Sequence, residues 1–285
     1  YQGKYVAAPV NVHRVNWLWA NPEVFRKAGA SIPTTWADFM VQAKKIQDAG
    51  YIALAHGGQA WQDNTVFEAV VLGVGGAEYY KKAFVELDMK ALNSSTTDEV
   101  FKVFGELRQF IDANAPGRDW NVATSMVING EAAMQIMGDW AQGEFAVAEQ
   151  VAGTDYSCLP GLGVTELLST GGDAFYFPVL TDEAQIAAQS ELAALMLRPD
   201  TQVAFNLAKG SLPVRGDIDL SAANDCMQKG LALLADGAIL PDTAQLITPD
   251  TADQISTLFI EFFADSSITV EDAQVQFASI IATAR

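Results

Sequence analysis

Apolar residues recur along most of this chain at the three- and four-residue spacing of helices that bury one face. The segment 35–49 is typical, because Phe39, Ala43 and Ile46 form one apolar stripe and Gly50 follows its end. The same spacing predicts further helices over residues 65–74, 98–113, 120–129, 140–150, 183–196, 199–208, 221–235, 251–263 and 270–282. Helices should therefore make up most of the structure.

Strand patterns are few and short. Compact or alternating apolar runs occur at residues 5–10, 51–55, 132–136 and 171–177. Trp17 and Trp19 would lie on one strand face, which favours a place in the core over a place in a binding site. Strands alternating with helices predict the α/β class with an excess of helix.

Length and charge exclude several classes of protein. With 285 residues and 50% hydrophobic content, the chain can form one large domain or two of medium size. Its longest apolar runs fall short of the roughly 18 residues that a membrane-spanning helix needs. The net charge of −18 disfavours nucleic acid and direct insertion into anionic membranes. Two stretches rich in helix-breaking residues, 153–170 and 209–219, are interpreted as segments where the chain crosses between two structural units.

Trp61 is the most informative single residue. It follows a Gly-Gly pair, is flanked by Gln59 and Gln62, and lies between a predicted strand and a predicted helix. Ligands of open α/β sheets bind at such junctions. Trp120 and Trp140 also precede or open helices beside polar residues, and a sugar ring would cover such indole faces. A packing role for Trp61, as core or as a lid for the next helix, stays open.

Two carboxylates could serve either of two functions. Asp139 and Asp173 each lie in a glycine-containing turn beside an aromatic residue. They could be the acid and base of a glycosidase, or they could bind sugar hydroxyls. The two histidines, His13 and His56, lie in no nucleophile–base motif. The sequence alone therefore predicts no catalytic set.

Metal and cofactor motifs are not evident. Cys158 and Cys226 lack neighbours in zinc-ligand spacing, and a disulfide between them is favoured over two buried thiols if the protein is exported. The run 73–76 resembles a phosphate loop, but it follows a predicted helix and is interpreted as a helix C-cap. We expect no metal and no cofactor.

Several motifs together resemble the ABC-transporter extracellular sugar-binding proteins. The glucose-binding branch fits best, and the maltose-binding protein is a more distant relative. The motifs occur in the family's order and span nearly the whole chain. They are residues 5–21, the Pro-Thr-Trp entry at 33–39, Gly-Gln-Ala-Trp at 58–61, 117–121, Met-Gly-Asp-Trp at 137–140, Gly-Asp-Ala-Phe at 172–175, and 209–215.

This resemblance implies a two-lobed periplasmic-binding-protein fold of type II that closes on a sugar by a hinge. Residues 10–152 and 217–285 would form the C-terminal lobe, and residues 1–9 and 153–216 would form hinge segments and the remainder of an N-terminal lobe. Relatives carry a long segment before this point, so the first lobe is expected to be incomplete. The implied protein is a monomeric, periplasmic or extracellular receptor, not an enzyme, that delivers its sugar to a membrane ABC permease.

The resemblance also assigns roles to individual residues. Trp61 and Trp140 align with aromatics that stack on the sugar, and Gln59, Asp139 and Asp173 fall where relatives bind hydroxyls. Lys209 falls near the cleft, and Gln62 and Trp120 complete the predicted ligand-binding set. Residues 247–250 stand where the glucose-type branch presents a histidine, so the resemblance implies a sugar without specifying glucose. A glycoside hydrolase using Asp139 and Asp173 is the alternative.

Overall fold

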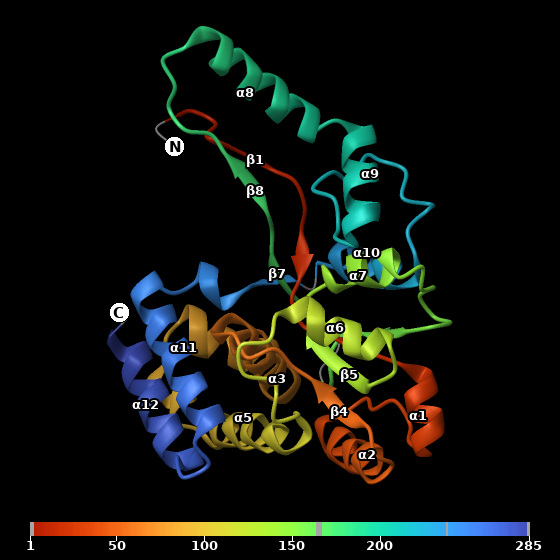
Figure 1. Cartoon of the computed structure of the whole chain (residues 1–285). Helices are drawn as coiled ribbons and strands as arrows, with labels where there is room; N and C mark the ends of the chain where they lie inside the picture. Colours follow the sequence, from red (N-terminus) through yellow and green to blue (C-terminus); the bar gives the residue numbers. More distant parts are fainter. Residues whose placement is uncertain (1–2, 164–166, 238, 284–285) are drawn as a thin grey trace.

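The computed structural model describes residues 3–163, 167–237 and 239–283, and it shows a compact body from which an arm projects (Figure 1). We call the four-stranded sheet with its covering helices the body. The arm consists of β1 (Ala7–Pro9), β8 (Ala174–Tyr176), α8 (Glu183–Met196) and α9 (Pro199–Lys209). The model is mixed α/β and rich in helix, as predicted.

The sheet of the body has the strand order β4-β5-β3-β6. β4 (Ile52–Ala55) and β5 (Ala132–Met137) are parallel, whereas β3 (Trp17–Ala20) is antiparallel to both β5 and β6 (Ser157–Leu159). The chain after residue 153 thus first completes this sheet with β6 and only then crosses to the arm. The extents of the two lobes remain a prediction.

Alternation along β3 assigns its two faces to two cores. Leu18 and Ala20 belong to a large cluster, and Trp17 and Trp19 to a smaller one, as predicted for two core tryptophans. The large cluster is covered by α1 (Pro22–Ala28), α2 (Trp36–Asp48), α3 (Ala60–Tyr80), α4 (Met89–Leu92), α5 (Ser95–Glu106), α11 (Pro249–Ala264) and α12 (Val270–Thr283), with η1 (Lys81–Val85) and η2 (Leu107–Phe110). The smaller cluster is covered by α6 (Trp120–Ile128), α7 (Ala141–Val147) and α10 (Asp225–Ala235).

The helix α3 corrects the C-cap prediction for residues 73–76. The backbone breaks only at Gly76, which has a positive φ of 66°, and the helix then resumes to Tyr80. Gly73 lies inside the helix for a packing reason, because a Cβ there would be 2.0 Å from the carbonyl oxygen of Leu162. The glycines therefore bring a distant segment against α3 and kink it.

Short strands connect the body with the arm. β2 (His13–Arg14), β7 (Leu168–Gly171) and β9 (Ile239–Pro241) form a sheet of order β2-β7-β9, and η3 (Thr243–Gln245) follows β9. The single strand predicted over 171–177 is instead divided between β7 and β8. Gly172 separates them where the chain passes so close to the carbonyl of Asn11 that a Cβ would be 2.6 Å from its oxygen.

The arm buries little apolar surface. Among the described residues of α8, Met196 is the one buried side chain, whereas Ile186, Leu192 and Leu195 are exposed. The helix begins at a local signal, since the Asp182 side chain accepts a hydrogen bond from the Gln185 amide. Across the described part of the chain, every helix is too short or too polar to cross a lipid bilayer.

Candidate functional site

The candidate site lies at one edge of the main sheet. β4 and β5 are parallel, so their carboxyl ends meet at this edge, and β3 begins there with Trp17 opposite Met137. The loop after β4 leads through Gln59 into α3, and the loop after β5 leads through Asp139 into α7. This is the position at which open α/β sheets bind ligands.

Two indoles face each other at this edge. The rings of Trp61 and Trp140 have centroids 6.2 Å apart and planes inclined by 53°. The Trp140 ring folds back over Gly138, where a Cβ would be 2.2 Å from an indole carbon. Trp61 is 40% exposed, whereas Trp140 packs partly against the smaller core. The two aromatic residues predicted to stack on a sugar therefore lie side by side.

The Gln59 side chain holds the Trp61 indole. Its Oε1 accepts hydrogen bonds from Trp61 Nε1 and Gln62 Nε2, both at 3.0 Å. Its Nε2 donates to Asp119 Oδ1 at 2.6 Å. Gln62 is fully buried and also donates to the Arg118 carbonyl, so it lies beneath the site rather than on its surface. This amide cluster orients the indole and links the starts of α3 and α6.

Among the described residues, no ring contact joins Trp120 to the indole pair. It opens α6 and packs against the smaller core. Its carbonyl oxygen accepts hydrogen bonds from Thr124 and Gln135. Trp120 is therefore near the site through its neighbour Asp119, while its ring contributes to packing.

His13 joins the two carboxylates that the sequence singled out. Its Nδ1 lies 2.5 Å from Asp139 Oδ1, and its Nε2 lies 3.0 Å from Asp173 Oδ2. The other oxygen of Asp139 accepts from the Arg14 amide at 3.0 Å, and Asp139 is only 2% exposed. The ring of His13 also meets Trp140 edge-on, with centroids 5.1 Å apart. One buried imidazole thus positions both carboxylates and one indole.

Asp173 is the more accessible of the two acids. Its side chain is 49% exposed, and its Oδ2 accepts from Lys209 Nζ at 2.6 Å and from Asn11 Nδ2 at 2.9 Å. Lys209 ends α9, where Gly210 adopts a positive φ of 82°. The predicted residues Asp173 and Lys209 therefore form a half-exposed ion pair beside His13.

Burial and the neighbouring charges act in opposite directions on the pKa values of this cluster. Burial alone would lower the pKa of His13, but hydrogen bonds and attraction to Asp139 and Asp173 raise it above its usual value. Burial would raise the pKa of Asp173, but hydrogen bonds from Lys209, Asn11 and His13 hold it below the usual range. Burial raises the pKa of Asp139, and the hydrogen bond and attraction of His13 oppose that rise. The raised pKa of His13 and the lowered pKa of Asp173 favour an imidazolium that pairs with ionised Asp173.

Sequence patterns gave no role to His13. Its partners come from the loop after β5, 126 positions away, and from the turn before β8, 160 positions away. The only local signal is its place in the extended segment that runs into β3. Long-range pairing of strands, rather than any motif, brings the three residues together.

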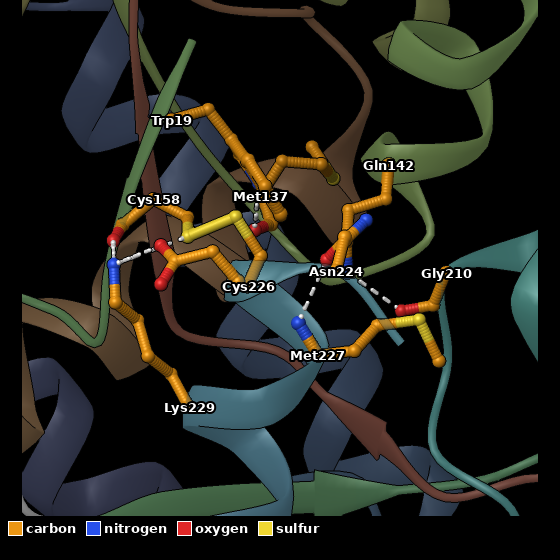
Figure 2. The surroundings of a disulfide bond; sticks show 10 residues. Trp19, Met137, Gln142, Cys158, Gly210, Asn224, Cys226, Met227 and Lys229 are labelled. Carbon is orange, nitrogen blue, oxygen red and sulfur yellow. Dashed lines mark hydrogen bonds and ion pairs between the residues drawn. A yellow bond between two sulfur atoms is a disulfide. The ribbon is translucent and has the colours of Figure 1, made fainter. Parts of the chain in front are cut away.

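The predicted disulfide is present. Cys158 of β6 and Cys226 of α10 are bonded, and their Cα atoms are 5.9 Å apart (Figure 2). Trp19 and Met137 lie beside the bond, so it fastens α10 to the main sheet. Asp225 is near enough to complete a metal-binding group with the two sulfurs, but the sulfurs are committed to each other.

Comparisons with known proteins agree on one family. The family model of the bacterial extracellular solute-binding proteins matches residues 1–202. A probable sugar-binding periplasmic protein of Mesorhizobium japonicum is 46% identical over 232 residues, which cover 81% of this chain and 55% of that protein. The corresponding protein of Rhizobium meliloti is 43% identical over 83% of this chain and 56% of its own length.

The fold is shared with solved structures. A chitin oligosaccharide binding protein superimposes with a TM-score of 0.82 at 18% identity, over all of this chain and 72% of that one. At this identity the likeness shows the fold alone. The chain spans about half the length of the curated relatives it matches. Because the family model covers well over half of its residues, the chain belongs to the bacterial extracellular solute-binding proteins.

Proposed function

We propose that this chain serves in a non-enzymatic receptor that binds a mono- or small oligosaccharide in the periplasm or outside the cell. The receptor would then deliver the sugar to a membrane ABC permease. The observation that carries the proposal is the indole pair Trp61–Trp140 beside the half-exposed Asp173–Lys209 pair. Indole faces match the C–H faces of a sugar ring, and charged edge groups match its hydroxyls.

The roles within the site follow from exposure and from occupied hydrogen bonds. Trp61 presents an exposed indole, and Asp173 and Lys209 offer polar atoms at the surface. Asp139 and Gln62 are buried and hold His13 and Gln59 in place. We therefore assign direct sugar contacts to Trp61, Trp140, Asp173 and Lys209. The remaining predicted site residues, Gln59, Gln62, Trp120 and Asp139, are assigned supporting contacts.

The glycosidase alternative gains no support from this geometry. A glycosidase needs one protonated acid and one separate base or nucleophile facing the scissile bond. Here Asp139 has both oxygens engaged and is shielded from solvent, and it shares His13 with Asp173. The pair is built for mutual positioning rather than for proton transfer to a substrate.

Calorimetric titration against a panel of monosaccharides and disaccharides tests the proposal. A saturable heat with at least one sugar, and no change in the recovered sugar, is the expected result. Chromatography of the sample after long incubation provides the second reading. Turnover of any sugar, or an absence of binding across the panel, would contradict the receptor assignment.

A further inference from the structure

A cavity of about 200 Å³ lies on α3 next to Trp61. Most of its wall is apolar and includes the aromatic rings of Phe67, Phe84 and Phe259. Its polar wall is contributed by Asn64, Thr65, Glu68, Asp242 and Thr243. Cavities of this order accommodate a single small ring or a substituent of one.

Most side-chain donors that line this cavity are used within the protein. Trp61 Nε1 donates to Gln59, and Asn64 Nδ2 donates to Ser256. The hydroxyl of Thr65 donates to the Trp61 carbonyl, and the hydroxyl of Thr243 donates to Glu68. These hydrogen bonds leave the second N–H of Asn64 as the one side-chain donor that a ligand could use among the described residues of the wall.

Acceptor atoms outnumber this donor at the same wall. Asn64 Oδ1 is buried and has no hydrogen-bond partner among the described residues. Glu68 and Asp242 add two carboxylates, and the described lining contains no lysine, arginine or histidine. A group that donates hydrogen bonds and carries positive charge matches these two carboxylates.

Glu68 is the unusual member of the group. It is almost wholly buried, it accepts from Ser169, Tyr80 and Thr243, and the described lining of the cavity supplies no cation to pair with it. Burial, with a smaller contribution from Asp242, raises the pKa of Glu68 to about 7. Buried carboxylates are ordinarily paired with a cation. A cationic ligand would supply the missing partner.

We propose that the cavity beside Trp61 binds the ammonium group of an amino sugar. An ammonium group has three donors and no acceptor, and aromatic rings attract cations. The inference rests on the proposed sugar-binding function and narrows its substrate class, because Trp61 borders both the cavity and the indole pair.

Matched sugars provide the test. Glucosamine, glucose and N-acetylglucosamine form one set, and the galactose and mannose series form two more. In at least one set, the amino sugar should bind about tenfold more tightly than both the neutral sugar and the N-acetylated sugar of that set. Neutral sugars that bind as well as their amines would overturn the inference and leave the receptor function standing. If no sugar of any set binds, the receptor function and the inference both fail.

Two substitutions localise the effect. Glu68→Gln should reduce the preference for the amine to less than about threefold, because a neutral amide cannot pair with an ammonium group. Glu78→Gln is the control, since Glu78 lies on the same helix but is exposed and pairs with Lys82; it should leave the preference unchanged. A preference that survives Glu68→Gln would place the ammonium elsewhere and overturn the assignment. If Glu68→Gln fails to fold, Asp242→Asn replaces it.

A proton count gives an independent reading. An ammonium group that enters the cavity stabilises ionised Glu68, so binding should release protons at a pH where the free amine is already fully protonated and Glu68 is still partly protonated. Titrations in two buffers of different ionisation enthalpy measure that release. Amine binding without proton release would contradict the contact with Glu68.

Discussion

The body and the arm contain helices of similar length with opposite surroundings. On α11 the side chains of Ile255, Leu258 and Phe259 are buried in the main core, whereas α8 buries only Met196 among its described residues. Both helices begin with a side-chain cap, from Thr248 and Asp182. Local caps and helix-forming residues are thus enough to specify a helix, but they do not decide whether its apolar residues are covered.

The site lies where these two regions meet. Trp61, Trp140 and Asp139 come from the body, whereas Asp173 and Lys209 come from the turn before β8 and the end of α9. His13 on β2 bridges the two groups. Candidate ligand-binding residues of the body are therefore fixed by a packed core, while those of the arm depend on a few hydrogen bonds and ion pairs.

The largest effect should come from removing an aromatic ring at the centre of the body. Phe67 contacts Phe101, Phe104, Phe259 and Phe277 and is 3% exposed. Phe67→Ala should lower the free energy of unfolding by about 3–5 kcal/mol, because it leaves a cavity among rings that cannot collapse. Urea denaturation followed by circular dichroism measures this loss of unfolding free energy. A loss below about 1 kcal/mol would mean that the core is loosely packed.

Removing the exposed indole should affect binding more than folding. Trp61→Ala should weaken sugar binding by about 2 kcal/mol, as loss of an aromatic anchor commonly does. Its effect on unfolding should be smaller, because the ring is 40% exposed. Calorimetry measures the change in sugar affinity, and thermal melts measure the change in stability. Trp36→Ala is the control, since Trp36 is 6% exposed in the core and should lower stability instead. Normal binding by Trp61→Ala with a much lower melting temperature would show that Trp61 is a core residue.

Local patterns predicted many of the elements but not the contacts among them. The helix expected at 183–196 is α8, residue for residue, because its start is encoded by an adjacent capping residue. By contrast, the predicted helix end near residue 74 was wrong, since Gly73 packs on Leu162 and the helix resumes after Gly76. Periodicity reports which face of an element is apolar, and it carries no information about a partner that lies far along the chain.

The candidate site shows the same limit. Glycines and tryptophans at the ends of strands marked Trp61 and Trp140, and these rings do meet. The burial of Gln62 and the use of Asp139 as a partner of His13 depend on loops that meet only in the folded chain. Residue type and loop position therefore located the region, while the division between contacting and supporting residues depends on how distant parts of the chain pack together.

The link between body and arm through His13 should depend on pH. The folded pKa of His13 is raised, so its ion pairs contribute fully below the unfolded value of 6.5 and are lost as pH rises through the folded value. The stability advantage of the wild type over His13→Gln should therefore shrink on the alkaline side. Urea denaturation at a series of pH values measures this difference. An advantage that grows with pH would mean that His13 is neutral in the folded protein.

NMR provides the direct check on that prediction. The chain has only two histidines, His13 and His56, so His13→Gln assigns both ring signals at once. The His13 signal should titrate at a pH above the ordinary value for histidine. Titration below that value would show that burial outweighs the two carboxylates.

The smallest effect should be found on α8. Leu192→Ala replaces a 40%-exposed side chain by the best helix former, so lost burial and gained propensity nearly cancel. The free energy of unfolding should change by less than about 0.5 kcal/mol. Leu258→Ala on α11 is the matched control, because Leu258 is 2% exposed, and it should cost about 2–5 kcal/mol.

Hydrogen exchange extends this comparison from single side chains to whole helices. Amides of α8 should exchange by local opening with little protection, since few apolar contacts hold the helix in place. Amides of α11 should exchange only on global unfolding, because Leu258, Phe259 and Phe262 anchor that helix in the core. Equal protection of the two helices, together with a large loss in Leu192→Ala, would show that α8 is covered in solution. The difference in burial between α8 and α11 would then not correspond to a difference in their stability.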